Sequence, residues 1–378
     1  MASVPSGSAL LRRILPLLVA VAAIVPFLPA LDGGFNWDDI PNLVENPHYR
    51  GLGWTQLKWM FTTNLLGHYV PLAWMTLGLN YVLGGMNPWG YHLTNLLLHG
   101  ANAALFYFAA RRLLALALPP HPGLSPGGGE GALTLGAVLA ALVFGVHPLR
   151  VESVTWVTER RDVLCGVFFL LAVLAYLRGV RSGGTIQRWW WTLSVGAFVL
   201  ALLSKAAAMP LPAVLLLLDI YPLRRVDPVG WRRLLTEKMP YLGLAVASAV
   251  MALIAQTRAE AVTGYQDYGI AARVAMACYS FMFYPWKFVW SAELSPLYEL
   301  PPQVNPFFNH DPVYPFVSDN ARMMRHPILE HRRVFQDHPT AFSSSILFPP
   351  LGIQFVGAAD NARIHHFRVV PDHRFPYS

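Results

Sequence analysis

The sequence predicts an all-α, polytopic membrane helix bundle with a long first extracytoplasmic loop. Of its 378 residues, 54% are hydrophobic and only 13% are charged. A soluble domain carries about 25% charged residues, so this chain has too few polar side chains to cover a water-facing surface. Its apolar residues also fall in runs separated by arginine clusters, a pattern typical of membrane proteins. These observations disfavour a secreted disulfide scaffold and a disordered chain.

The charge and the cysteines exclude further classes. The net charge is +7, but the basic residues cluster between the apolar runs, as the positive-inside rule expects. We therefore expect no nucleic-acid partner. The two cysteines, Cys165 and Cys278, lie in apolar runs without metal-ligand or CxxC spacing. Redox and zinc chemistry are accordingly disfavoured.

Eight apolar runs are predicted to span the membrane. They cover residues 14–30, 91–118, 133–146, 163–177, 189–204, 209–220, 241–255 and 271–290. We interpret the first as an uncleaved anchor in preference to a signal peptide. Several runs are shorter than the roughly 20 residues that cross a bilayer, which is tolerated when helices line a cavity within a bundle.

Arginine clusters predict the orientation. The N-terminus, the Arg111–Arg112 end and the Arg224–Arg225 loop are expected in the cytoplasm. This predicts a multi-pass protein of the cell (inner) membrane, with the 31–88 segment outside and residues 69–84 as an amphipathic stretch at the membrane surface. The exception to the rule is Arg160–Arg161, which falls on the outer side. Such a costly placement near a membrane indicates a function.

The chain is predicted to divide near residue 302. Residues 1–302 form the transmembrane domain, with about eight spans. Residues 303–378 are an irregular tail rich in His, Pro and Arg, in which only 343–359 resembles a partial span. Two interpretations of this tail stay open, an extramembrane domain and a truncated or aberrant end.

Two adjacent carboxylates follow the first span. Residues 35–39 read Phe-Asn-Trp-Asp-Asp. Asp38 and Asp39 fit a solvated turn, a metal site or an acid/base pair, and for an arbitrary Asp-Asp pair the solvated turn is the commonest case. No metal-ligand spacing is evident, so the cofactor is unknown; a divalent metal is possible but not implied.

A polar stretch between two apolar runs lies on the same predicted side. It runs from His147 through Glu152 to Arg160 and Arg161. One interpretation is a polar hairpin whose charges pair with each other. The other is a site for an anion, since arginine offers a planar donor fork that suits phosphate.

Other polar residues on this side are candidates for supporting roles. Lys205, at the outer end of a span, either snorkels to the interface or joins the arginine pair around a phosphate. His92 and His99 lie seven residues apart on one helix face. For histidines so placed, a buried hydrogen-bonded role is commoner than ligation.

Taken together, these segments resemble a known family. The quoted stretches are 35–39, Tyr-Val-Pro-Leu at 69–72, Gly-Tyr-His-Leu at 90–93, the specific stretch 147–164, Ser-Lys at 204–205 and Leu-Asp-Ile-Tyr-Pro-Leu at 218–223. They resemble the membrane part of bacterial relatives of the TMTC-type protein O-mannosyltransferases. Those are glycosyltransferases of the GT-C fold, often followed by tetratricopeptide repeats, of which this chain contains no array.

The resemblance implies a GT-C-like bundle with an extracytoplasmic catalytic centre. It implies a polyprenyl-phosphate sugar donor, with mannose as the family's sugar, and a protein or glycan acceptor. Asp38 is our preferred general base and Asp39 its helper. Arg160, Arg161 and Lys205 are predicted to bind the donor phosphate, with His147, Glu152, His92 and His99 in support.

Two other classes stay open. A transporter or flippase of a lipid-linked or anionic substrate would use the same cations and a cavity between broken helices. An inactive, structural membrane protein is the third interpretation. The charges cluster on one side of the predicted membrane and no inverted repeat is seen, which favours the enzyme over the transporter.

Overall fold

A computed structural model describes residues 7–118, 126–181, 183–259 and 269–291. All of them belong to one compact unit, Met1–Val304. The predicted tail, 303–378, lies outside the described residues, and so does its apolar stretch at 343–359. The predicted division into two domains therefore stays a prediction.

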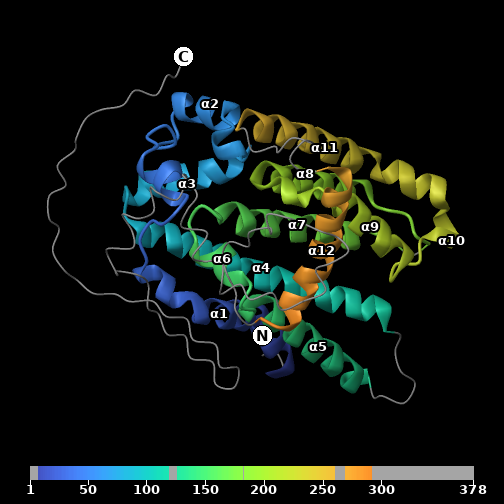
Figure 1. Cartoon of the computed structure of the whole chain (residues 1–378). Helices are drawn as coiled ribbons and strands as arrows, with labels where there is room; N and C mark the ends of the chain where they lie inside the picture. The colour runs from blue at the N-terminus through green and yellow to red at the C-terminus, as the bar shows by residue number, and fades with distance from the viewer. Residues whose placement is uncertain (1–6, 119–125, 182, 260–268, 292–378) are drawn as a thin grey trace, which may run out of the picture. The chain divides into compact units, whose positions relative to one another are not determined.

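The prediction of an all-helical chain is confirmed (Figure 1). Within the described ranges the β-structure is a single isolated bridge between Val180 and Ile186. The helices and short helical turns are α1 (Gly7–Ile24), η1 (Val25–Asp32), η2 (Ile40–Val44), α2 (Trp54–Thr62), η3 (Leu65–Gly67), α3 (Pro71–Gly84), α4 (Pro88–Ala117), α5 (Pro126–Val146), α6 (Arg150–Thr155), α7 (Arg160–Gly179), α8 (Arg188–Ser204), η4 (Ala206–Ala208), α9 (Leu211–Ile220), α10 (Val226–Val229), α11 (Trp231–Arg258) and α12 (Ile270–Val289).

Each of the eight predicted spans falls on a helix, and four of these helices are long and apolar enough to cross a membrane. Those four are Arg13–Asp32, Gly129–Val146, Arg160–Gly179 and Trp231–Arg258, and a shorter apolar helix covers Ala206–Ile220. Their outward side chains suit lipid: Leu17, Leu139 and Leu253 are each more than half exposed. The chain therefore has the character of a multi-pass membrane protein. The exact number of crossings and their orientation stay predictions.

Small residues let the helices around α4 approach closely. α4 packs against α1, α5 and α7. A Cβ atom on Gly145 of α5 would lie 2.7 Å from the Cβ of Ala23, and one on Gly100 of α4 would lie 2.6 Å from Ile24 Cδ1. These positions leave no room for a larger side chain. Close approach through small residues is a common way for helices to associate in membranes.

A buried ionic cluster joins α7, α9 and α11. Asp219 has no exposed surface, and its carboxylate binds the Arg225 guanidinium at 2.9 Å, the Lys238 ammonium at 2.5 Å and the Tyr176 hydroxyl at 2.8 Å. Arg225 lies in the loop between α9 and α10, as the sequence predicted. It is buried there, and its ion pairs with Asp219 and Glu237 connect α9 to α11.

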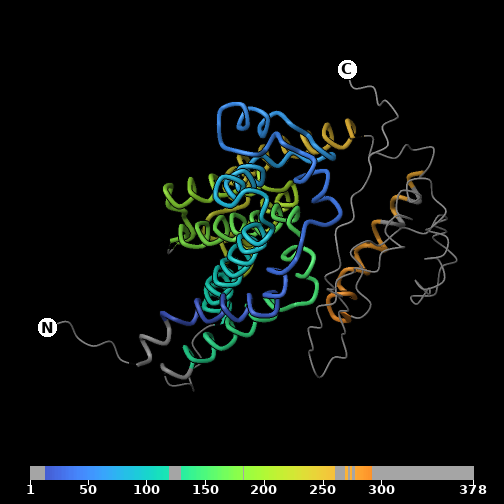
Figure 2. The backbone as a smooth tube through the Cα atoms, turned by 90° about the vertical axis from the view of Figure 1, so that its left-hand side faces the viewer, coloured from blue at the N-terminus to red at the C-terminus, as the bar shows by residue number. Residues whose placement is uncertain are grey.

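The segment between η1 and α4, residues 33–87, is called here the first loop. Figures 1 and 2 show α2 and α3 gathered at the end of α4 where that helix begins. Tyr49 and Trp74 pack there in one buried cluster with Tyr91 of α4, and the Tyr49 and Tyr91 hydroxyl oxygens lie 3.2 Å apart. The first loop is therefore a packed part of the bundle.

The sequence predicted that residues 69–84 form an amphipathic stretch. Most of this segment is the helix α3, which buries Trp74 and Leu77 in a cluster with other residues of the first loop and with Tyr91 of α4. Its outward face carries Leu79, Val82 and Leu83, all exposed and apolar. Both faces of α3 are therefore apolar. One face is buried within the first loop and the other is exposed.

Candidate active site

The Asp39 carboxylate is buried and joins the first loop to the turn before α7. Its Oδ1 atom accepts hydrogen bonds from the Thr158 backbone N–H at 2.7 Å and from the Thr158 hydroxyl at 2.5 Å. Its Oδ2 atom accepts the Asn36 backbone N–H at 3.1 Å. Burial raises the pKa of Asp39 above its ordinary value, although these hydrogen bonds oppose the rise. Asp39 is thus a fixed, fully engaged carboxylate.

Asp38 lies next to it in a different environment. It is half-buried, and within the described ranges its carboxylate accepts no hydrogen bond. Its backbone carbonyl accepts the Asn42 side-chain amide at 2.8 Å and the Asn42 backbone N–H at 3.0 Å. Of the two carboxylates, Asp38 is the one whose oxygens have no hydrogen-bond partner among the described residues.

The turn that carries Thr158 is held from α4. The Asn95 amide donates to the Val154 carbonyl at 3.3 Å and to the Trp156 carbonyl at 3.0 Å. These bonds satisfy backbone carbonyls where α6 ends, which would otherwise be left without partners. They fix the place from which the next residues, Thr158 to Arg161, extend.

Arg160 is buried away from the other two predicted phosphate ligands. It has no exposed surface. Its guanidinium donates to the Asn95 side chain at 2.5 Å, the Asn80 side chain at 2.6 Å and the Tyr91 carbonyl at 2.7 Å. Each of its three nitrogens is therefore engaged, and together they fasten α3, α4 and α7.

Arg161 and Lys205, in contrast, are brought together by shared carboxylates. Glu159 receives both cations, Arg161 on Oε1 and Lys205 on Oε2 at 2.9 Å. Lys205 also contacts Asp162 at 2.5 Å. Burial alone would raise the pKa of Glu159, but the hydrogen bonds and charges of Arg161 and Lys205 outweigh burial and lower it. The predicted cation site is thus an ionic network with acids of its own.

The four predicted supporting residues occupy separate places. His92 Nε2 lies 3.4 Å from the Gly34 carbonyl, and His99 Nε2 lies 2.8 Å from the Gly145 carbonyl. His147 stacks on Phe288, and its Nε2 lies 2.9 Å from the Phe288 carbonyl. Glu152 is exposed on α6. Each histidine ring therefore contacts a backbone carbonyl of another segment, and His92 is the one whose partner, Gly34, lies near Asp38 in the sequence.

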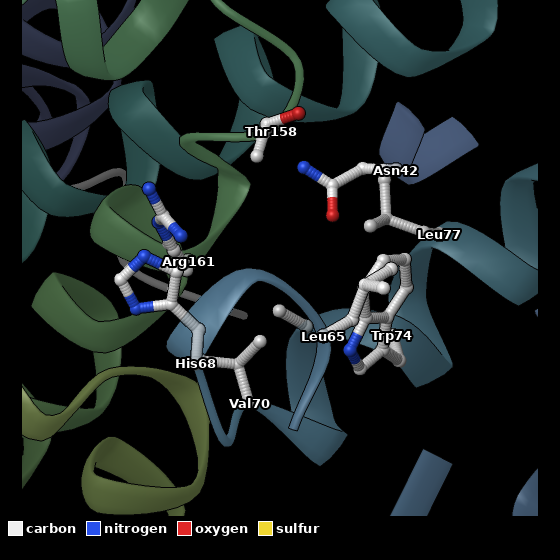
Figure 3. A pocket seen from close by; sticks show the side chains of 9 residues that line it. Asn42, Leu65, His68, Val70, Trp74, Leu77, Thr158 and Arg161 are labelled. Atoms are coloured by element: carbon white, nitrogen blue, oxygen red, sulfur yellow. The ribbon is translucent and has the colours of Figure 1, made fainter. Parts of the chain in front are cut away.

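A cavity lies between the first loop and the turn before α7. Figure 3 shows Arg161 and His68 on one side of it and Trp74 and Leu77 on the other. Thr158, the partner of Asp39, also lines it. The remaining lining residues are Asn42, Leu65, Val70 and Ala73. The cavity thus touches both predicted halves of the site, through Thr158 on the carboxylate side and Arg161 on the cation side.

Comparison with known proteins points to sugar transfer. The chain is 30% identical over 215 residues to protein O-mannosyl-transferase tmtc2 of Xenopus laevis, a match that covers 54% of this chain and 24% of that protein. It is 33% identical over 205 residues to TMTC4 of Homo sapiens, covering 50% and 27%. To Tmtc3 of Drosophila melanogaster it is 28% identical over 236 residues, covering 56% and 25%. The chain shows distant homology to the TMTC protein O-mannosyl-transferases.

The homology to these O-mannosyl-transferases is limited in extent. The chain spans about a quarter of the length of the relatives named here. No protein-family model matches it, and no solved structure matches it. What the homology supports at this level is a membrane glycosyltransferase.

The structure adds residues to which the sequence prediction gave no role in the site. Glu159 and Asp162 flank the arginine pair, and this alternation of charges was a signal for an ion-pair network. His68 and Trp74 carried no such signal, because their place in the cavity depends on how the first loop packs. In the residues the structure describes, no group of three or more His, Cys, Asp or Glu side chains could hold a metal ion.

Proposed function

We propose that this protein is an integral-membrane glycosyltransferase. It moves a hexose, with mannose as the sugar named for its relatives, from a polyprenyl-phosphate donor to a hydroxyl group of a protein or glycan. The observation that carries the proposal is the Asp39–Thr158 contact. It joins the Asp-Asp turn to the segment that presents Arg161, and one cavity is lined by both Thr158, the partner of Asp39, and Arg161.

Asp38 is proposed as the general base. The acceptor hydroxyl gives its proton to the Asp38 carboxylate while its oxygen attacks the anomeric carbon of the sugar. The bond from that carbon to the phosphate oxygen breaks, and polyprenyl phosphate leaves. Asp38 suits this role because its carboxylate is half-buried and unengaged among the described residues, whereas Asp39 is held by Thr158. Proton transfer by a positioned group contributes about 10²- to 10⁴-fold in rate.

Arg161, with Lys205 beside it, is proposed to hold the leaving phosphate. Negative charge grows on that phosphate as the bond breaks, so a fixed cation stabilises the transition state more than the ground state. The Nε and Nη2 atoms of Arg161 donate to Glu159, and Nη1 has no partner among the described residues. The Glu159 and Asp162 carboxylates hold the two cations in place before the donor binds.

Arg160 is proposed to hold α3, α4 and α7 in place and not to contact the donor. Its three nitrogens already hold Asn80, Asn95 and the Tyr91 carbonyl. A phosphate would have to displace partners that are buried. The sequence-based prediction that Arg160 binds phosphate is therefore refined to a structural role.

The test is transfer by the purified full chain in lipid nanodiscs. The donor is polyprenyl-phosphate mannose labelled in the sugar, and the readouts are label on a serine- and threonine-containing acceptor peptide and release of polyprenyl phosphate. Asp38→Asn should lower transfer by about 10²-fold or more, and Glu45→Gln, an exposed carboxylate of the same loop, is the matched control. In sealed proteoliposomes, movement of intact donor across the bilayer without release of phosphate would contradict the proposal and favour a flippase.

A further inference from the structure

The cavity beside Arg161 collects nitrogen donors that have no partner. The Trp74 indole N–H is buried without a hydrogen bond, and Trp74 is 4% exposed. The His68 imidazole accepts and donates no hydrogen bond among the described residues. Arg161 has one guanidinium nitrogen, Nη1, that binds neither Glu159 nor any other described residue. All three side chains line the same cavity.

We propose that His68 and Trp74 complete an anion site with Arg161 and bind the phosphate of the donor. This inference rests on the proposed function, because the donor's lipid-linked phosphate is the anion that function brings to this cavity. His68 and Trp74 are then phosphate-contacting residues of the first loop. Arg161 supplies the charge from the other side.

The buried indole is the strongest indication of a ligand. A buried donor without a partner costs about 1–3 kcal/mol, so most buried N–H groups find an acceptor. Trp74 packs edge-on against Trp59 and beside Tyr49, which fixes the ring. The ring also lies across the cavity from Arg161 (Figure 3). An acceptor atom in the cavity would satisfy the indole without moving it.

His68 is placed in the cavity by a specific turn. Leu66 and Gly67 both have positive φ angles, 49° and 75°, and the Gln256 side chain of α11 donates to the Gly67 carbonyl at 3.1 Å. A glycine suits the second position because it adopts this conformation without strain. The turn thereby delivers the imidazole next to Arg161.

The lining is mostly apolar, and its polar side chains favour an acceptor atom of an anion. Among the lining residues there is no Asp or Glu, while Arg161 contributes a positive charge and His68 and Trp74 contribute ring nitrogens. Burial, and then the charges of Arg161 and Lys205, lower the pKa of His68 to about 4. At neutral pH the imidazole is therefore uncharged and can donate one N–H without repelling the cations. Three nitrogen donors therefore border a small cavity that has room for an oxygen atom of a phosphate and not for the whole group.

Binding of farnesyl phosphate to the full chain in nanodiscs tests the site. Farnesol, which lacks the charge, corrects for partition into lipid, and inorganic phosphate distinguishes a free phosphate from a lipid-linked one. His68→Phe and Trp74→Phe each remove a donor and should weaken binding about tenfold, the value of a hydrogen bond to a charged group. His68→Gln keeps an N–H donor and should stay within about threefold of the wild type.

Matched controls come from the same loop. His48→Phe and Trp54→Phe replace exposed residues of the same types and should leave affinity unchanged. The unfolding temperature of each variant shows whether weaker binding comes from a lost contact or from a damaged fold. Weaker binding by His68→Phe at an unchanged unfolding temperature, with rescue by His68→Gln, supports a direct contact.

The outcomes separate this inference from the function it rests on. Unchanged affinity in His68→Phe and Trp74→Phe, together with a loss in Arg161→Gln, would overturn the inference and leave the proposed function standing. If the wild type binds farnesyl phosphate no better than farnesol, both the inference and the proposed function are overturned. If inorganic phosphate binds as tightly as farnesyl phosphate, the anion site stands and the lipid-linked donor is overturned.

Discussion

The carboxylate of Asp39 accepts two hydrogen bonds from Thr158, a residue 119 positions later in the chain. One comes from the backbone N–H and one from the hydroxyl. The contact fastens the turn that carries Asp38 to the turn that carries Arg161. This buried contact therefore helps to set the distance between the proposed base and the proposed phosphate ligand.

Replacing Thr158 with Val should loosen this connection. The backbone N–H would still reach Asp39, but the hydroxyl donor would be lost inside a buried site. Leaving a buried acceptor short of a donor costs about 1–3 kcal/mol. We expect a lower unfolding temperature and reduced transfer, measured in nanodiscs. Thr62→Val, at an exposed position of α2, is the control, and an equal effect of both changes would argue against a role for the pair.

Asp38 and Asp39 should respond differently to the same substitution. Asp38→Asn should lower transfer by about 10²-fold or more with little effect on stability, because the carboxylate is half-buried and unengaged among the described residues. Asp39→Asn should lower the unfolding temperature, because an amide offers one acceptor oxygen where Thr158 and Asn36 need two. Transfer rates and thermal unfolding of both variants give the comparison. Full activity in Asp38→Asn would show that the base lies elsewhere.

Substitutions of Arg160 and Arg161 should also differ in whether they change stability or binding. Arg160→Lys leaves the Asn80, Asn95 and Tyr91 oxygens to share one ammonium, so the unfolding free energy should fall by about 2 kcal/mol or more. Arg161→Gln should alter stability less, since Lys205 remains to pair with Glu159, but should weaken binding of farnesyl phosphate. A stable Arg160→Lys protein that fails only in phosphate binding would restore the sequence-based assignment.

The ionic cluster around Asp219 should contribute to stability and not to transfer. Asp219→Asn leaves Arg225 and Lys238 buried without their shared carboxylate, and breaking a buried pair in this way costs about 3–5 kcal/mol. Asp227→Asn, at an exposed position nearby, should cost almost nothing. Thermal unfolding measures both. The surviving folded fraction of Asp219→Asn should still bind farnesyl phosphate with the affinity of the wild type, and a loss of affinity would link the cluster to the site.

The sequence predicted the helices better than the site, for a physical reason. Apolar runs and their proline or glycine boundaries are local, so each of the eight predicted spans falls on a helix. Phosphate binding by Arg160 was inferred from the cost of a cation near lipid. The structure meets that cost with side-chain amides and a carbonyl from α3 and α4, partners that lie 65 to 80 residues away and leave no signal beside Arg160.

The candidate site was partly within reach of sequence reasoning. Asp38, Asp39 and the 147–164 stretch were singled out from motifs, and the Asp39–Thr158 contact brings them together. His68 and Trp74 could not be identified in this way, because a histidine and a tryptophan in an aromatic loop are common. Their unpaired nitrogens become meaningful only once the loop is packed and the cavity is in place.

The pH dependence of stability should report on His68. Its pKa is lowered to about 4, first by burial and then by the charges of Arg161 and Lys205, which Glu159 partly offsets. In the unfolded chain a histidine takes up a proton near pH 6.5, whereas the folded protein resists protonation until about pH 4. The stability that this group contributes is therefore complete above pH 6.5 and is lost as the pH falls from there towards 4.

Comparison with His68→Gln isolates this contribution, because the glutamine does not titrate and other groups, such as Asp39 with its raised pKa, are common to both proteins. Between pH 7.5 and pH 5 the wild type should lose up to about 2 kcal/mol more unfolding free energy than His68→Gln. Chemical unfolding in mixed micelles at both pH values measures the difference, with His48→Gln as the exposed control. Parallel pH dependence in the wild type and His68→Gln would mean that the imidazole is not buried beside the cations, and the anion site would lose one of its three donors.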